Sequence, residues 1–210
     1  RHRCTFEAQP ATEPYRSPRE TQRPAIPGVQ TAVVVGKKDE DVWTDQHGRV
    51  KILFHWDREG EKDEHASCWV RVASPWSGKG WGFVGLPRTG QEVVVQFEEG
   101  DPDRPLVTGM VYNAESRAPW PLPADRLKTG LRTRSSDKGT GFHELVFDDR
   151  KGAELVRLQS ERDFTQIVKN NAEITVGLGH KAPGTFKQTI HGDKTERIVE
   201  GNHRFAVETG

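Results

Sequence analysis

Apolar and polar residues alternate along several short segments in the first half of the chain. The alternating apolar positions are Val50, Ile52, Phe54 and Trp56, then Cys68, Val70 and Val72, then Val93, Val95 and Phe97. A period of two over runs of this length predicts half-buried β-strands, so we expect each of these side chains on a core face. The aliphatic run at 29–35 predicts a further strand, and segments rich in Gly, Pro and Asp at 57–60, 77–80 and 100–105 predict turns.

Five or six short strands between residues 29 and 113, with no convincing helix among them, indicate an all-β fold with a small closed or nearly closed barrel. Proline-rich segments lie on both sides of it. Because proline lacks a backbone donor and resists helix formation, we expect an extended connector at 1–28 and a linker at 114–141.

Residues 142–210 follow a different pattern. Apolar runs at 142–147 and 155–158 flank a charged turn that ends at Gly152, which predicts a hairpin. After residue 164 the apolar residues are mostly single and separated by polar ones, so this segment lacks the residues for an ordinary core.

The end of the chain is repetitive. Ile190 and Ile198 are eight residues apart, and so are Val199 and Val207. Repeats of this length predict a solenoid or a stacked array, in which each repeat has too little apolar surface to fold alone. Two arrangements would cover that surface: one chain coiled into a β-helix, or three chains wound into a prism, which also pairs every strand edge.

Composition narrows the function classes. Apolar residues make up 33% of the chain, and 31 Lys and Arg balance 31 Asp and Glu. The low apolar content indicates that part of the chain is extended or buries surface by association, and the neutral charge argues against a nucleic-acid partner. We expect reduced thiols at Cys4 and Cys68, the latter a small core residue.

No motif in the sequence indicates chemistry. G-x-S-x-G, P-loop, S-x-x-K, H-E-x-x-H and C-x-x-C patterns are absent, so we expect no catalytic residues, no cofactor and no resident metal. The alternative is a metal held between three chains by His191 or His203, but a solvent-facing histidine is the favoured interpretation of both positions.

Trp69 is out of phase with Val70 and Val72, which places it beside Arg71 on the outer face of its strand. Exposed tryptophan and arginine are enriched at interface hot spots, so Trp69 and Arg71 are candidates for contact with a neighbouring subunit. The alternative is a barrel that stacks bases or sugars of single-stranded nucleic acid or glycan on its aromatic residues.

The strand sequences DQHGRVKILFHWD, SCWVRV, GKGWG, PRTGQEVVVQFEEGDPDRP and TGMVYN resemble the barrel domain of the VgrG (valine-glycine repeat) spike proteins of type VI secretion, which is similar to the central spike of contractile phage tails. The resemblance implies an OB-fold-type barrel at 29–113 and the start of an intertwined trimeric β-helix or β-prism needle at 142–210. It also implies that 1–28 leads out of a preceding hub domain.

The same resemblance implies a non-enzymatic homotrimer that punctures target envelopes and carries effectors. An Hcp-type tube protein would bind through the hub, and a PAAR-type tip protein and effectors would sit at the distal needle. The protein would be made in the cytoplasm without a signal peptide and exported by the machine. A phage tail spike whose lytic domain lies outside this chain is the alternative.

In the needle that the resemblance implies, each chain turns its aliphatic and aromatic residues toward the common axis. The residues expected there are Ile190, Ile198, Val199, Phe205 and Val207.

Overall fold

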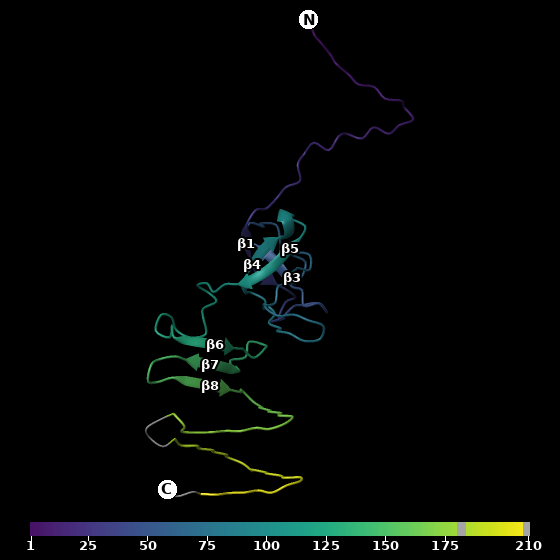
Figure 1. Ribbon diagram of the computed structural model, residues 1–210. Helices are drawn as coiled ribbons and strands as arrows, with labels where there is room; N and C mark the ends of the chain where they lie inside the picture. The colour runs from purple at the N-terminus through teal and green to yellow at the C-terminus, as the bar shows by residue number, and fades with distance from the viewer. Residues whose placement is uncertain (180–183, 208–210) are drawn as a thin grey trace. The chain divides into compact units, whose positions relative to one another are not determined.

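The computed structural model describes residues 1–179 and 184–207 (Figure 1). Within that range the chain forms eight β-strands and one short 3₁₀ turn, η1 (Glu98–Gly100). The all-β class predicted from the sequence is confirmed. The chain divides into two units, residues 1–163 and 164–210, and each is described by itself.

Five strands form the first sheet of the larger unit. They are β1 (Val29–Val35), β2 (Lys51–Phe54), β3 (Arg71–Val72), β4 (Glu92–Phe97) and β5 (Pro105–Met110). Their order is β2-β1-β4-β5-β3, with antiparallel pairing except between β3 and β5. The strand predicted at 29–35 is confirmed, and the other alternating segments each contain a strand.

The sheet curls until its two outer strands meet. Val50, just before β2, and Val70, just before β3, exchange two backbone hydrogen bonds, with N–H to O=C distances of 2.9 and 2.8 Å. This bridge joins the two ends of the strand order and closes the sheet into the predicted small barrel. Closure removes most of the unpaired strand edge that an open sheet would leave exposed.

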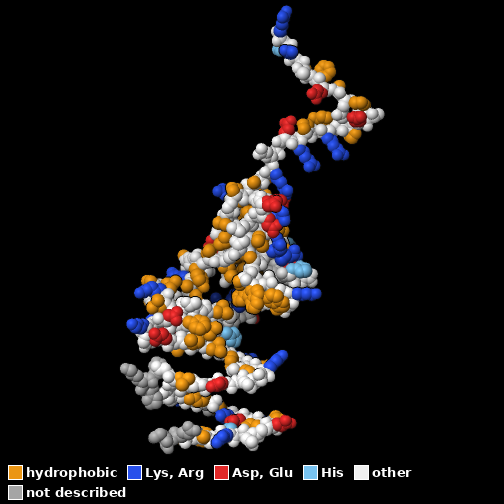
Figure 2. All heavy atoms as spheres, in the orientation of Figure 1, with side chains coloured by type: hydrophobic (Ala, Val, Ile, Leu, Met, Phe, Trp, Pro, Cys, Tyr) orange, Lys and Arg blue, Asp and Glu red, His pale blue; other side chains and the backbone are white. Residues whose placement is uncertain are grey.

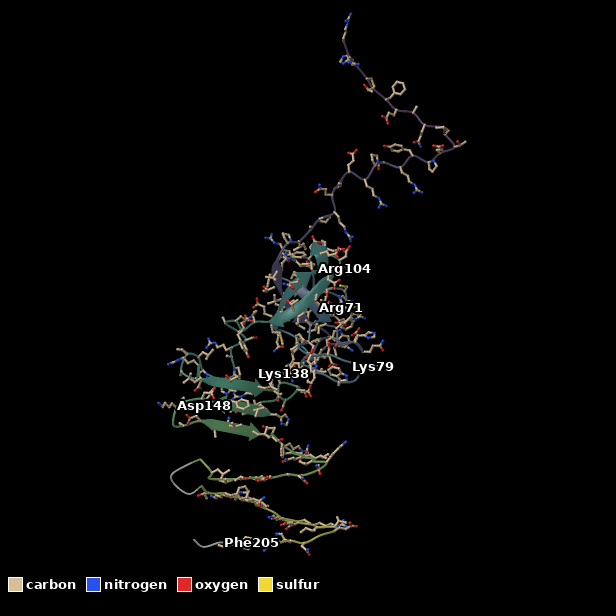
Figure 3. The ribbon with its side chains drawn as sticks, viewed as in Figure 1. Arg71, Lys79, Arg104, Lys138, Asp148 and Phe205 are labelled. Atoms are coloured by element: carbon tan, nitrogen blue, oxygen red, sulfur yellow. The ribbon has the colours of Figure 1, made fainter. Side chains whose placement is uncertain are left out.

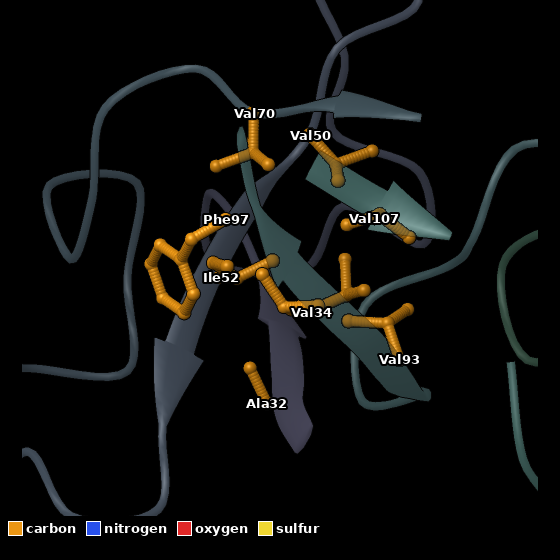
Figure 4. Close-up of a cluster of buried hydrophobic side chains, with 9 residues drawn as sticks. Ala32, Val34, Val50, Ile52, Val70, Val93, Phe97 and Val107 are labelled. Carbon is orange, nitrogen blue, oxygen red and sulfur yellow. The ribbon is translucent and has the colours of Figure 1, made fainter. Parts of the chain in front are cut away.

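Side chains from β1, β2, β4 and β5, and from the residues just before β2 and β3, converge inside the barrel (Figure 4). The buried cluster consists of Ala32, Val34, Val50, Ile52, Val70, Val93, Val95, Phe97 and Val107. These residues come from alternate positions of their segments, as the period of two requires. Burial of each Val or Ile side chain stabilises the fold by about 1.5–3 kcal/mol, so the barrel carries its own hydrophobic core.

Two residues predicted to lie in the core do not. Cys68 is exposed because strand pairing begins only at Val70 and Arg71, so its phase with Val72 has no structural meaning. Trp56 is 62% exposed because β2 ends at Phe54. Its indole stacks on the ring of Phe54 at 5.0 Å, and its N–H donates to Oε1 of Gln30 at 2.8 Å.

A tight turn leads the chain into β2. The Asp45 carboxylate accepts the backbone N–H groups of His47 and Arg49 at 2.9 and 3.0 Å and pairs with the Arg49 guanidinium. Burial alone would raise the pKa of Asp45, but these hydrogen bonds and the Arg49 charge lower it to about 2. The Asp45 carboxylate is therefore ionised at neutral pH and keeps the hydrogen bonds that hold the turn.

Residues 1–28 form neither helix nor strand, but their last part is fastened to the barrel. Arg23 pairs with Asp101 at 3.1 Å and with Asp103 at 2.9 Å. The Ile26 N–H donates to the Gly100 carbonyl at 2.8 Å, and its side chain packs against the barrel core. The connector is thus anchored at the turn that follows β4.

A second sheet lies in the same unit. It contains β6 (Lys128–Arg132), β7 (Glu144–Asp148) and β8 (Leu155–Gln159) in sequential antiparallel order. The predicted hairpin is confirmed between β7 and β8, and Gly152 adopts a φ of 80° in its turn, a conformation that favours glycine. Strand β6 lies inside the range 114–141 that was expected to be a linker. It was not predicted because it is only five residues long and has a glycine, Gly130, at its middle position.

The smaller unit contains no strand within residues 164–179 and 184–207. Its chain is extended and bends at 169–170, 177–179, 191–192 and 199–201 (Figure 1). The bends at 169 and 177, and those at 191 and 199, are eight residues apart, the same spacing as the aliphatic pairs. The eight-residue period of the sequence is therefore also a period of the backbone.

Replacing Ile52, which is 1% exposed in the barrel core, with alanine should lower the free energy of unfolding by about 3 kcal/mol, because it leaves a cavity in a closed core. Urea denaturation followed by circular dichroism measures the effect. Met110→Ala on β5 is the control, since Met110 is 55% exposed and its truncation should cost less than about 1 kcal/mol. Equal losses in the two variants would contradict the assignment of the core.

Candidate assembly surface

The sheet of β6, β7 and β8 has one apolar face that this chain leaves uncovered. Residues directly opposite each other in antiparallel strands point to the same side, so the register Leu131↔Leu145↔Leu158 and Thr129↔Phe147↔Val156 defines that face. Its five large apolar side chains are between 39% and 65% exposed: Leu131, Leu145, Phe147, Val156 and Leu158.

The opposite face carries charge, and it is nevertheless covered along the central strand β7, although Leu155 and Arg157 of β8 are exposed on it. Glu144, Val146 and Asp148 alternate with the exposed residues of β7 and are 2%, 4% and 3% exposed. This distribution is the reverse of an ordinary surface sheet, in which the apolar face packs inward and the charged face meets water. The apolar face therefore requires a partner outside the single chain.

Glu144 lies on the covered face at one end of the sheet, opposite Arg132 of β6 and Gln159 of β8. Its carboxylate accepts hydrogen bonds from Nε of Arg132 at 2.6 Å and from the indole N–H of Trp120 at 3.2 Å, and it pairs with Arg157. Arg132 comes from β6 and Arg157 from β8, so one carboxylate links all three strands.

The segment before β6 covers this charged cluster. Arg132 donates through Nη1 to the Pro119 carbonyl at 2.9 Å, and its guanidinium lies over the rings of Trp120 and Phe142, with distances of 5.6 and 4.6 Å to the ring centroids. Lys128 adds an ion pair with Asp125 at 3.0 Å. The proline-rich segment is thus held on the sheet by polar contacts of Glu144, Arg132 and Lys128.

The charges around Glu144 and Asp148 set their protonation. Burial by itself would raise the pKa of Glu144, but hydrogen bonds from Arg157 and Arg132 and their positive charges outweigh it and hold that pKa below its usual value. Hydrogen bonds from the Arg150 guanidinium likewise lower the pKa of Asp148. Both carboxylates are ionised at neutral pH.

Glycine is required at position 130 for a separate reason. A Cβ atom there would overlap the backbone carbonyl of Leu145 on the paired strand. The absence of a side chain lets β6 and β7 approach closely, and it explains the Gly that made this strand hard to recognise in the sequence.

The five residues predicted for the needle axis all lie at the surface of the single chain. Ile190 and Ile198 are partly exposed, and Val199, Phe205 and Val207 are more than 70% exposed. Figure 2 shows hydrophobic side chains at the surface of these extended segments, and Figure 3 shows Phe205 standing out from the last of them. Their role at an axis stays a prediction.

The two barrel residues predicted to contact a neighbour have partners within the chain. Trp69 is half-buried rather than exposed: it stacks on Trp43 with 6.4 Å between ring centroids and carries the Lys51 ammonium over its ring. Arg71 is exposed and pairs with Glu98, which also binds Arg104 at 2.5 Å (Figure 3). Their role at a subunit contact is a prediction that these contacts leave open.

The histidines considered for an interchain metal are solvent-facing. His203 lies 3.8 Å from Glu196, and His191 is exposed in a bend. In the part of the chain that the structure describes, no three His, Cys, Asp or Glu side chains lie together as a metal site would require. Within the same residues, no helix has the length and apolar character needed to cross a membrane.

Sequence reasoning missed the apolar sheet face and the cluster around Glu144. The signal was present in β7, where Leu145 and Phe147 alternate with Glu144, Val146 and Asp148. A charged residue at alternate positions normally marks the solvent side, so the pattern alone would have assigned the two faces in the wrong sense.

Two family models match the chain. Residues 30–112 match the type VI secretion system and phage-baseplate injector OB domain. Residues 129–209 match the C-terminal trimerisation domain of bacteriophage T4 gp5. The fold and its exposed sheet face therefore belong to the class of injector spikes, in which a barrel is followed by a trimerisation domain.

Curated relatives carry the comparison further. The chain is 50% identical over 80% of its length to the type VI secretion system spike protein VgrG1a of Pseudomonas aeruginosa strain PAO1, of which it covers 26%. It is 46% identical over 84% to spike protein VgrG5 of the same strain, covering 22% of it. It is 44% identical over 87% to the actin cross-linking toxin VgrG1 of Vibrio cholerae serotype O1, covering 17% of it.

The chain belongs to the VgrG family of spike proteins, as its sequence motifs predicted. It spans about a quarter or less of the length of these relatives.

Lowering the pH should destabilise the β6–β8 sheet through Glu144. Because its folded pKa is lowered, the ionised carboxylate contributes stability that is fully present above its unfolded pKa of about 4.3 and is lost as the pH falls through the folded value. Urea unfolding at pH 7 and at steps down to pH 3 measures this loss. Glu144→Gln should be less stable than the wild type at pH 7 and should show a shallower pH dependence below 4.5.

Asp149→Asn is the control, since it removes an exposed carboxylate from the neighbouring turn. It should leave the pH dependence close to that of the wild type. Identical slopes for Glu144→Gln and the wild type would show that Glu144 carries no share of the acid sensitivity.

Proposed function

We propose that this chain is part of a homotrimeric spike of a type VI secretion machine, in which an OB barrel is followed along the chain by the start of a three-chain needle. The observation that carries the proposal is the apolar face of the β6–β8 sheet, which no part of the described chain covers. The match of residues 129–209 to a trimerisation domain supports three as the number of copies.

The physical argument starts from the area left uncovered. One chain exposes Leu131, Leu145 and Phe147 on the sheet, and in 164–179 and 184–207 it exposes apolar side chains without forming any strand. Three chains wound round one axis bury these side chains against one another and give each extended segment a neighbour for its backbone groups. Threefold closure also leaves no open surface for continued growth.

The needle residues extend this proposal along the chain. We place the apolar positions in and next to the last extended segments toward the common axis: Ile190, Ile198, Val199, Phe205 and Val207. The charged residues between them, such as Lys194 and Glu196, which lie 3.6 Å apart, remain outside. Trp69 and Arg71 are proposed as barrel contacts to a neighbouring copy.

The work of such an assembly is mechanical. The whole protein would puncture a target envelope when the machine contracts, and it would carry effectors. We propose an Hcp-type tube protein bound through a hub domain connected at 1–28, and a PAAR-type tip with effectors at the distal needle. Production in the cytoplasm, export by the machine and the absence of catalysis in these residues complete the proposal.

Light scattering tests the trimer directly. The wild-type chain should have a solution mass of about 71 kDa, three chains of 23.6 kDa, and should keep it on dilution and in added salt. Leu145→Asp should raise the monomer fraction more than tenfold, because each copy would place an unpaired carboxylate in an apolar interface.

Val84→Asp is the matched control, since Val84 is 82% exposed on the barrel and outside the sheet. It should leave the mass unchanged. A folded wild-type chain of 23.6 kDa would overturn the trimer, and a Leu145→Asp variant that stays trimeric would remove the sheet face from the interface.

Val199→Asp tests the needle positions separately. A carboxylate at the proposed axis should expose 164–207 to proteolysis and lower the thermal midpoint of the trimer, because three like charges would meet in an apolar environment. Limited proteolysis with mass spectrometry reads the result. Thr195→Asp, an exposed residue between the apolar positions, should behave as the wild type; equal sensitivity of both variants would argue against an axial Val199.

A further inference from the structure

Burial of the charged cluster around Glu144 costs desolvation free energy, which burial of the hydrophobic residues of the sheet does not. The Glu144 side chain is fully buried, whereas those of Arg132 and Arg157 keep 28% and 48% of their exposure. A carboxylate taken out of water loses hydration, and its attraction to the two guanidinium groups only approximately compensates. Replacement of such a cluster by apolar residues is often neutral or stabilising. Stability alone therefore gives a weak reason for this cluster of charges on the covered face.

The sheet would have two usable faces without these charges. Val146 lies at the centre of the covered face and Leu155 at its edge, opposite Asp148, while Gly130 has no side chain at all. Stripped of Glu144, Arg132 and Arg157, this face would keep Val146 and Leu155 and would lose the charges at one of its ends, with Asp148 and Lys128 remaining at the other. A second copy could then pack on either side, and association would no longer have a single outcome.

We infer that Glu144 selects the face on which copies of this chain assemble. It does so in two ways, and both follow from its contacts. It holds Trp120 directly and Pro119 through Arg132, so that the proline-rich segment occupies the face. If that face were turned to a threefold axis, three Glu144 carboxylates would approach one another, which is unfavourable in an apolar environment.

Glu144 thus acts as a positioning residue for assembly through Arg132, Arg157 and Trp120, and it makes no contact with the apolar face itself. The inference rests on the proposed trimer, whose interface is the opposite face. It adds the reason why the interface forms there and nowhere else on the sheet.

The test separates selection from stability. The triple variant with Glu144→Leu, Arg132→Leu and Arg157→Leu removes the whole cluster, so no buried charge is left without a partner. We expect its thermal midpoint to equal or exceed that of the wild type, and its light-scattering mass to spread above three chains. Tryptic cleavage after Arg117, in the covering segment, should become about tenfold faster or more, because the charge-assisted hydrogen bonds that hold the segment are gone.

The matched control is the double variant with Asp148→Leu and Arg150→Leu. Asp148 lies on the same covered face, but its pair with Arg150, at 2.5 Å, stays within one hairpin and holds no part of the covering segment. This variant should keep a single mass of three chains. If it spreads as widely as the triple variant, any added apolar surface is sufficient and Glu144 is not the selector.

Glu144→Gln gives a second, milder test, since it keeps the shape of the side chain and removes only its charge. It should speed cleavage after Arg117, because the covering segment loses its charged anchor, while Arg132 and Arg157 keep the face charged. Unchanged cleavage would overturn the inference, as would a triple variant that stays a single trimer. A wild-type chain that is not trimeric would instead contradict the proposed function, so the two failures are distinguishable.

Discussion

The apolar face formed by Leu131, Leu145, Phe147, Val156 and Leu158 is the constraint on which the C-terminal half of this protein depends. The hydrophobic effect disfavours a face of this kind in water, and the described chain contains nothing that covers it. The extended residues after 164 also expose apolar side chains, and in addition they lack strand partners for their backbone groups within the described chain. Both features are explained together if folding of this half is completed by other copies.

The barrel, by contrast, buries its apolar side chains within the single chain. Its five strands curl until Val50 and Val70 pair, and the valines and Ile52 of alternate positions fill the space enclosed. The connector is then fastened to the outside through Arg23 and Ile26. One chain thus combines a self-contained module with a segment whose apolar surface is available only for association, an arrangement that suits a spike whose needle is built from several chains.

The covered face of the second sheet shows how polar groups contribute to such an arrangement. Glu144, Arg132 and Trp120 fasten a proline-rich segment over one side of the sheet, and this leaves the other side as the open one. Hydrophobic residues supply the driving force for association, while the buried charges determine its direction. The proposal that Glu144 selects the face follows from this division between driving force and direction.

Local pattern was sufficient for much of this fold. The period of two identified the alternating barrel segments, because strand geometry imposes that period whatever surrounds it. The aliphatic run identified the strand at 29–35, and the charged turn that ends at Gly152 identified the β7–β8 hairpin. The long motifs between His47 and Asn113 identified the family, and the eight-residue spacing near the end recurs in the bends of the backbone.

The alternation also predicted the buried side of the barrel segments, as Val50, Ile52 and Val93 show, and tertiary structure decided the exceptions. Cys68 and Trp56 continue an alternating pattern beyond the residues that pair, so their phase carried no information about burial. Strand β6 was hidden by Gly130, whose role depends on the carbonyl of a residue in the next strand. Glu144 was the hardest to foresee, because a carboxylate in a strand is expected in water. Only the arrival of Arg132, Arg157 and Trp120 from distant positions makes its burial possible, and no local pattern encodes contacts of that separation.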